Sequence, residues 1–154
     1  MAKPRTQGRV NLPPNLARVN EAATRDKSAR LAALLHHVDG EALTRAFRRL
    51  RRNAAVGVDG ETVETYEQGL AGRLRDLHDR VHSGRYRAHP VRRVYIPKSD
   101  GGQRPLGIPA LEDKIVQGAV AETLSAVYEK DFLGFSYGFR PGRSPHLALR
   151  ATRR

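Results

Sequence analysis

The chain has 154 residues, enough for one domain with a modest hydrophobic core. Lys and Arg total 28 against 16 Asp and Glu, so the formal net charge of +12 indicates a polyanionic partner, with nucleic acid as the first candidate. There is no Cys, which excludes disulfides and cysteine-ligated zinc, and no apolar run approaches the roughly 20 residues that a membrane helix requires.

The charge is distributed unevenly along the chain. Residues 1–30 contain seven basic and two acidic residues, and residues 91–154 contain eleven basic and six acidic residues. In residues 31–90 the numbers are nearly balanced, with ten basic and eight acidic residues. Phosphate contacts are therefore expected near the two ends. Because the first residues lack the apolar stretch of a secretory signal, a cytoplasmic protein without a membrane partner is predicted.

The N-terminal segment, residues 1–28, is basic and contains three prolines. This composition predicts a flexible tail, with residues 29–154 as the folded region. Pro13 and Pro14 oppose a helix at their own positions, so only a short helix that begins near Leu16 is expected in this segment.

Two helices are predicted between Ala29 and the basic cluster Arg48–Arg52. The first is interrupted at Asp39–Gly40. Within the basic cluster, Arg51 and Arg52 are candidate RNA contacts, although cations at a helix C-terminus also interact favourably with the helix dipole. The second helix has an apolar face formed by Leu43, Phe47 and Leu50.

A loop at residues 53–60 precedes the most regular helix predicted in the chain. Thr62 is its expected N-cap, and Gly84 lies where a glycine commonly follows a helix C-terminus. Residues that step by three or four define one apolar face: Val63, Tyr66, Leu70, Leu74, Leu77 and Val81.

A β-hairpin is predicted next. Val91–Ile96 is rich in β-branched and aromatic residues and indicates a strand, and Ser99–Gly102 is typical of a hairpin turn. Pro105 and Pro109 flank a short return strand, which is expected at a sheet edge because proline cannot donate a backbone hydrogen bond.

The C-terminal part is predicted to contain the helix Leu111–Lys130, a loop at Gly134–Gly142 and a final helix. Ser144 is the expected N-cap of that last helix, with Pro145 in its first position. Together these elements predict an α+β fold that is mostly helical and carries one short antiparallel hairpin.

The hairpin offers the best candidate for chemistry. Lys98 precedes the turn and Arg104 follows it, so the two strands can place both cations on one side of a small site. A lysine point charge and a forked arginine suit a triphosphate, whose charge grows during phosphoryl transfer. The alternative is an exposed basic hairpin without a ligand.

The run Phe139–Ser144 is a second candidate, because a glycine turn that leads into a helix N-terminus presents N–H groups to a phosphate. Arg140 and Arg143 would add positive charge there. The alternative is a helix cap flanked by solvated arginines.

Other motifs do not indicate a catalytic site. His78 and His82 lie one helical turn apart, but no third ligand is evident and the glutamate of a zinc-protease motif is missing, so both are interpreted as surface residues. Asp59 is interpreted as a loop residue and Asp113 as an acid at a helix start. No Walker-type phosphate loop is present.

The segment Arg92–Gln117, RRVYIPKSDGGQRPLGIPALEDKIVQ, and the segment SYGFRPGRS at residues 136–144 resemble bacterial group II intron reverse transcriptases/maturases. The upstream GVDGET loop at residues 57–62 fits the same family, and the resemblance extends from about Asn15 to Leu149. These proteins are RNA-directed DNA polymerases, that is, nucleotidyltransferases with a right-hand architecture.

The resemblance implies that this chain forms the fingers of such a polymerase, with Lys98 and Arg104 contacting the incoming dNTP. It also implies that the loop at residues 57–60 lies beside template or group II intron RNA, and that the turn at Arg140–Arg143 shapes the nucleotide cleft. Mg²⁺ is implied for the full-length family and not for this chain alone. The residues predicted to contact RNA are Arg51, Arg52, Arg92, Arg93, Arg140 and Arg143.

Two departures from the family pattern bear on activity. The family's metal-binding aspartates, thumb and maturase regions are expected beyond Arg154, and Leu147 follows His146 where the family has an acidic or amide residue. The chain is therefore expected to contain no catalytic residue and to have no polymerase activity by itself. Its palm would be lost by frameshift or truncation, or supplied by a second chain. Two alternatives stay open: a stand-alone basic RNA-binding module, and a non-functional product of a decayed intron gene.

Overall fold

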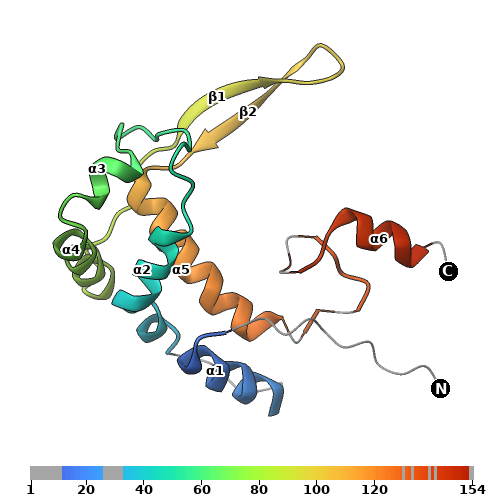
Figure 1. Ribbon diagram of the computed structural model, residues 1–154, viewed down its shortest axis with the longest axis horizontal. Helices are drawn as coiled ribbons and strands as arrows, with labels where there is room; N and C mark the ends of the chain where they lie inside the picture. Colours follow the sequence, from blue (N-terminus) through green and yellow to red (C-terminus); the bar gives the residue numbers. More distant parts are fainter. Residues whose placement is uncertain are drawn as a thin grey trace. The chain divides into compact units, whose positions relative to one another are not determined.

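The computed structural model describes residues 12–25, 33–129, 131–132, 134–138, 140 and 142–152. The chain divides into two units, with residues 33–122 in one and residues 1–32 and 123–154 in the other. Among the described residues, helices predominate beside a two-stranded antiparallel sheet (Figure 1). This confirms the predicted α+β class.

The unit of residues 33–122 begins with a short 3-10 turn, and the side chain of Asp39 then accepts a hydrogen bond from the Ala42 amide at 2.7 Å to cap the first helix. Its elements are the 3-10 turn Leu35–His37, α2 (Gly40–Arg48), α3 (Val63–Glu67), α4 (Leu70–His82), β1 (Arg92–Pro97), β2 (Gln103–Ile108) and the first part of α5 (Leu111–Tyr128).

Helices α2 to α5 enclose the hydrophobic core of this unit. A Cβ atom at Gly118 would lie 3.2 Å from the Cβ atom of Ala46, so α2 and α5 approach closely where both carry small residues. Such close packing lets the larger side chains around this crossing exclude water. The buried residues of the core are Val38, Ala42, Leu43, Ala46, Phe47, Val63, Tyr66, Leu74, Leu77, Leu111, Ile115 and Ala119.

The prediction of one continuous helix from Val63 to Val81 is wrong. The structure has two helices, α3 and α4, because Gln68 leaves the helical conformation and Gly69 adopts a left-handed one with φ of 76°. Apolar residues on both sides of the break still face the same core, which explains why the periodicity continues through it.

Several predicted helix ends are confirmed. Thr62 caps α3, with its hydroxyl accepting from the Thr65 amide at 3.2 Å, and the two residues form a reciprocal capping box. Gly84 follows α4 with φ of 71°, and its amide donates to the Val81 carbonyl at 3.2 Å. Ser144 Oγ accepts from the Leu147 amide at 3.3 Å at the start of α6.

The helix predicted from Ala29 is only partly testable, because residues 26–32 lie outside the described residues. The remaining part, up to Asp39, contains only the 3-10 turn Leu35–His37 and no α-helix. The helix prediction is therefore wrong for residues 33–38.

The second unit contains α1 (Pro14–Arg25), the last part of α5 and α6 (Pro145–Thr152). The expected short helix near Leu16 exists, but Pro14 is its first residue, where the missing N–H of proline removes no hydrogen bond. The Asn20 amide donates to the Ala126 carbonyl at 2.7 Å and joins α1 to the end of α5. The tail boundary near residue 28 stays a prediction.

The predicted hairpin is confirmed, and it extends from the helices of its unit with the turn at its far end (Figure 1). Strands β1 and β2 pair in antiparallel register, with Arg93 opposite Gly107 and Ile96 opposite Arg104. None of the helices in the described ranges is long and apolar enough to cross a membrane.

Candidate nucleic-acid interface

Lys98 and Arg104 lie on the same face of the hairpin. Residues directly opposite each other in a strand pair share a face, so Arg104 lies on the face of Ile96. Lys98 directly follows β1 and its amide pairs with the Gly102 carbonyl, so the alternation continues and places Lys98 on that face too. A Cβ atom at Gly102 would lie 3.8 Å from Cδ of Lys98, so the lysine side chain lies beside Gly102. Both cations are exposed, as the sequence-based argument requires.

The turn holds Lys98 in a defined position. Its amide donates to the Gly102 carbonyl at 2.8 Å, and its carbonyl accepts from the Gly101 amide at 3.2 Å. Asp100 Oδ1 accepts from the Gly102 amide at 2.9 Å, and Gly101 has φ of 81°, a left-handed conformation that costs glycine little. This is a three-residue hairpin loop of a common type.

The loop at residues 53–60 is packed against the base of the hairpin. A Cβ atom at Gly57 would lie 2.6 Å from the Pro109 carbonyl oxygen and from Cα of Ala110, so only glycine fits there. Arg92 Nε, at the start of β1, donates to the Val56 carbonyl at 2.9 Å. Arg92 therefore has a structural partner in addition to its predicted role in RNA contact.

The same loop is bound to the start of α5. Asp59 Oδ2 accepts from the Leu111 amide at 3.0 Å, and Lys114 Nζ donates to the Ala55 carbonyl at 2.8 Å. The first amides of a helix have no intrahelical partner, so the Asp59 carboxylate satisfies one of them. The interpretation of Asp59 as merely a loop residue missed this role, because its partner is 52 positions away.

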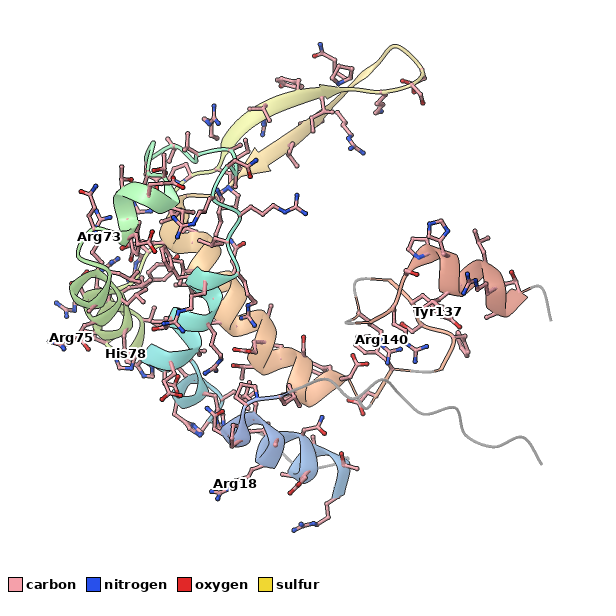
Figure 2. All side chains as sticks on the ribbon, in the orientation of Figure 1. Arg18, Arg73, Arg75, His78, Tyr137 and Arg140 are labelled. Atoms are coloured by element: carbon pink, nitrogen blue, oxygen red, sulfur yellow. The ribbon has the colours of Figure 1, made fainter. Side chains whose placement is uncertain are left out.

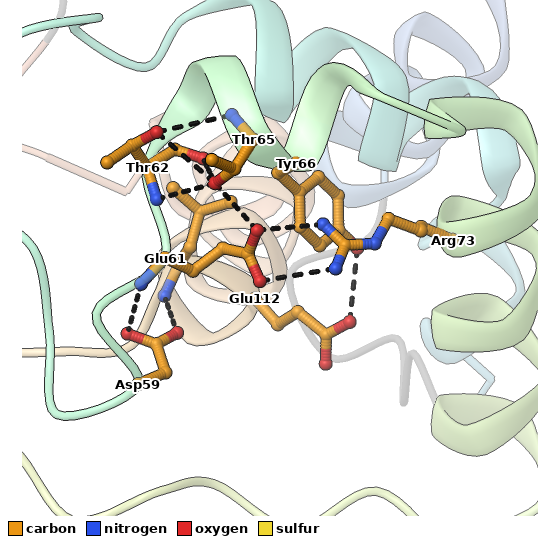
Figure 3. Close-up of polar contacts among 8 residues, drawn as sticks. Asp59, Glu61, Thr62, Thr65, Tyr66, Arg73 and Glu112 are labelled. Atoms are coloured by element: carbon orange, nitrogen blue, oxygen red, sulfur yellow. Dashed lines mark hydrogen bonds and ion pairs between the residues drawn. The ribbon is translucent and has the colours of Figure 1, made fainter.

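An ion-pair network connects α3, α4 and α5 (Figure 3). Glu61 accepts two hydrogen bonds from Arg73, at 2.9 and 3.2 Å, and the guanidinium lies over the Tyr66 ring at 4.5 Å. The Tyr66 hydroxyl donates to Glu112 at 3.1 Å, and Arg80 donates to the same carboxylate at 2.8 Å. Burial, followed by the nearby Glu112 charge, raises the pKa of the Tyr66 phenol.

The arginines of the described residues differ in whether a carboxylate is paired with them. Within the described part of the chain, six form ion pairs with carboxylates: Arg45, Arg49, Arg52, Arg73, Arg80 and Arg140. In contrast, residues 84–104 contain six Lys or Arg and a single acid, Asp100. None of these six cations is ion-paired with a carboxylate in the same described part, so positive charge is concentrated on and before the hairpin.

Arg140 is buried and bound internally. Its side chain is 2% exposed, donates to Glu129 Oε1 at 2.6 Å and to the Ser136 carbonyl at 2.8 Å, and lies over the Phe132 ring (Figure 2 shows its position). A guanidinium that is buried and bonded to Glu129 and Ser136 is not available to a phosphate while these bonds are intact. RNA contact by Arg140 stays a prediction that this geometry does not favour.

The other predicted RNA contacts differ in environment. Arg143 is half-buried, with its guanidinium 5.3 Å from the Tyr137 ring centre. Arg52 is exposed but forms a two-pronged ion pair with Glu67 at 2.9 and 3.1 Å. Arg51 and Arg93 are exposed and form no ion pair with any described carboxylate. Their contacts with RNA stay predictions.

Asp113 is a buried acid whose role the sequence did not reveal. It is 2% exposed, and its carboxylate accepts hydrogen bonds from the Tyr86 hydroxyl and, at 3.0 Å, from the His89 amide. Asp113 thus attaches the segment before β1 to α5. Residues 85–87 have the sequence Arg-Tyr-Arg, in which one aromatic residue lies between two charged ones. This pattern could have suggested that the tyrosine side chain points inward.

His78 and His82 contact each other and nearby oxygen atoms. The rings of His78 and His82 stack at 4.2 Å, His78 Nδ1 lies 3.2 Å from Asp79 and His82 Nε2 lies 3.0 Å from the Val38 carbonyl. No group of three or more His, Asp or Glu side chains that could hold a metal ion occurs among the described residues.

No protein-family model matches the chain. It is 50% identical over 97 residues to protein YkfC of Escherichia coli (strain K12), covering 63% of this chain and 26% of that protein. It is 36% identical over 110 residues to the group II intron-encoded protein LtrA of Lactococcus lactis subsp. cremoris, covering 71% and 18%. It is also 38% identical over 110 residues to the uncharacterized 91 kDa protein in the cob intron of Schizosaccharomyces pombe, covering 69% and 13%.

The chain thus spans about a quarter or less of the length of these relatives. The similarity covers most of this chain, and two of the three relatives bear names that place them in introns.

Proposed function

Because the chain belongs to the family of group II intron-encoded reverse transcriptases/maturases, we propose that it contributes contacts to intron or template RNA and to the incoming nucleotide. In this proposal its helices and hairpin form part of the fingers of a right-hand polymerase. The activity of the whole relatives is not assigned to this chain alone.

The proposed contact with the incoming nucleotide rests on one observation. Lys98 and Arg104 are exposed on the same face of the hairpin, and hydrogen bonds hold the turn between them. Neither has a carboxylate partner in the described part of the chain, so a triphosphate would be their compensating charge. The lysine would act as a compact point charge and the arginine as a two-pronged donor. Both interactions strengthen as negative charge grows on the phosphates during transfer.

The residues present do not fit the Mg²⁺ that the family implies. The less exposed carboxylates of the described residues are already engaged, because Glu61, Glu112 and Glu122 accept from arginines and Asp113 accepts from Tyr86 and His89. We therefore derive no step through a metal ion from this chain.

The nucleotide contact can be tested by comparing the two faces of the hairpin. Lys98→Ala and Arg104→Ala should each weaken dNTP binding by the purified chain, whereas Arg93→Ala changes an exposed cation on the opposite face and should not. In a full-length relative, replacing either of the two matching residues should raise the nucleotide KM or lower kcat. The resulting fall in kcat/KM should correspond to a loss of roughly 1–3 kcal/mol of transition-state stabilisation for each residue. Equal effects of all three substitutions would refute a specific nucleotide site.

The RNA contact is supported by the cations of the hairpin, Arg92, Arg93, Lys98 and Arg104, which have no carboxylate partner among the described residues. Binding of an in vitro transcribed group II intron RNA should weaken steeply with salt, because each phosphate contact releases counterions. A salt-independent affinity, or no binding at low salt, would count against the proposal.

A further inference from the structure

The segment between α4 and β1, residues 83–91, has no regular secondary structure, yet it is held in place at several points. The Tyr86 amide donates to the Arg80 carbonyl at 2.9 Å, and the Tyr86 hydroxyl donates to the buried carboxylate of Asp113. The His89 amide donates to the other oxygen of that carboxylate at 3.0 Å. Tyr86 is half-buried as a result, and the segment is attached to α5 by one acid.

The side chains on either side of Tyr86 are exposed arginines. Arg85 Nε donates to Ser83 Oγ at 2.9 Å, and Arg87 Nη1 donates to the carbonyls of Gly84 and Tyr86 at 2.8 Å. All of these partners are neutral. The arginines therefore have defined local partners but keep their full positive charge toward solvent.

This arrangement differs from that of the neighbouring helix. On α4, Arg73 and Arg80 are paired with Glu61, Asp76 and Glu112, as expected for arginines that stabilise a fold. Two uncompensated guanidinium groups on an anchored backbone are instead suited to an anionic partner, because little conformational entropy would be lost on binding.

We propose that Arg85 and Arg87 form a further RNA phosphate-binding site, with Tyr86 and Asp113 as the positioning residues that hold the two arginines outward. This inference rests on the proposed RNA-binding function and adds a site outside the hairpin. Contact to phosphates is indicated because the two guanidinium groups are the charged donors of this segment, while the hydroxyl of Tyr86 is turned toward Asp113.

The test compares Arg85→Gln/Arg87→Gln with Arg75→Gln, a matched control on α4 that removes an exposed arginine without a carboxylate partner in the described residues (Figure 2). Binding of in vitro transcribed group II intron RNA to the full 154-residue chain is measured across KCl concentrations. The double variant should lower the slope of log K against log salt by about 1.5 and weaken binding roughly tenfold at physiological ionic strength. Arg75→Gln changes a cation outside the proposed site and should leave the slope essentially unchanged.

The positioning role has its own measurement. Tyr86→Phe should lower the salt slope in the unmodified chain but have no further effect when Arg85 and Arg87 are already replaced, because its action passes through them. A general loss of stability would instead weaken RNA binding equally in both backgrounds. Thermal unfolding of each variant shows whether the fold is retained.

The outcomes separate this inference from the proposed function. If the unmodified chain binds intron RNA but the Arg85→Gln/Arg87→Gln variant behaves like Arg75→Gln, the additional site is overturned and the proposed function stands. If the unmodified chain does not bind intron RNA even at low salt, the proposed RNA-binding function fails and this inference fails with it.

Discussion

Asp59 shows how one side chain can connect a loop to a helix that lies far away in the sequence. It belongs to the loop that packs against the hairpin base, and its carboxylate accepts from Leu111 at the start of α5. The neighbouring Gly57 is required because backbone atoms of Pro109 and Ala110 occupy the space of a side chain. The GVDG loop thus has a structural explanation that is independent of any RNA contact.

Asp59→Ala should lower the free energy of unfolding by about 1 kcal/mol, because the Leu111 amide loses its capping acceptor. Asp59→Asn keeps an acceptor oxygen and should cost less. Urea unfolding measures both variants, and amide hydrogen exchange at Leu111 localises the change. Unaltered protection of that amide in Asp59→Ala would contradict the capping role.

Glu61 provides a prediction of pH dependence. Hydrogen bonds donated by Arg73 and Thr65 lower the pKa of the Glu61 carboxyl below its ordinary value near 4.5. A depressed folded-state pKa contributes stability that is present above the unfolded pKa and is lost as pH falls through the folded pKa. The contribution is modest for a partly exposed pair, at most about 1 kcal/mol.

Glu61→Gln should therefore be less stable than the unmodified chain at neutral pH and should approach it at an acidic pH below the lowered folded-state pKa of Glu61, where the carboxyl is protonated. Urea unfolding at the two pH values gives the comparison. A stability difference that is the same at both values would show that the Glu61 charge is not responsible.

At the scale of elements, the break between α3 and α4 depends on the backbone conformation of Gly69. Two glycines three residues apart have opposite roles here. Gly69 has φ of 76° and begins α4, whereas Gly72 lies within α4 in ordinary helical geometry, and a Cβ atom at either position would have open space.

Gly69→Ala should destabilise the chain by about 1 kcal/mol, because alanine is strained in the left-handed conformation. Gly72→Ala should stabilise it by roughly 0.5–1 kcal/mol, because alanine favours the helix interior. Thermal and urea unfolding of the two variants give the sign of each effect. If both substitutions stabilised the chain, a continuous helix would be the better description.

The hairpin is the element that sequence reasoning described best. Its strands, its turn and the shared face of Lys98 and Arg104 all follow from contacts between residues of the single segment Arg92–Ile108. Helix caps at Thr62 and Ser144 were equally accessible, because a cap involves residues only three positions apart. The roles of Lys98 and Arg104 toward a nucleotide still depend on the proposed function.

At the scale of the whole molecule, we expect no Mg²⁺-dependent primer extension by the purified chain. Nucleotidyl transfer with two metal ions needs carboxylates that converge on ions about 4 Å apart. The least exposed carboxylates of the described residues instead accept hydrogen bonds from arginine, tyrosine and backbone groups. A full-length relative assayed in parallel is the positive control, and extension by this chain that EDTA abolishes would disprove the expectation.

The amino-acid sequence by itself determined the α+β class, the hairpin, the helix caps at Thr62 and Ser144 and the resemblance to the intron-encoded family. These features depend on local backbone preferences and on short motifs that few residues carry. The basic character of the chain was likewise a matter of counting residues.

Only the tertiary structure decided which charges are paired and which face solvent. Arg45 and Glu122 are 77 positions apart, and Asp59 and Leu111 are 52 apart, so no local pattern could reveal these bonds. Arg140 and Arg93 have the same charge in the sequence, yet one is buried against Glu129 and the other is exposed. The physical reason is that desolvation and ion pairing depend on which groups the fold brings together in space.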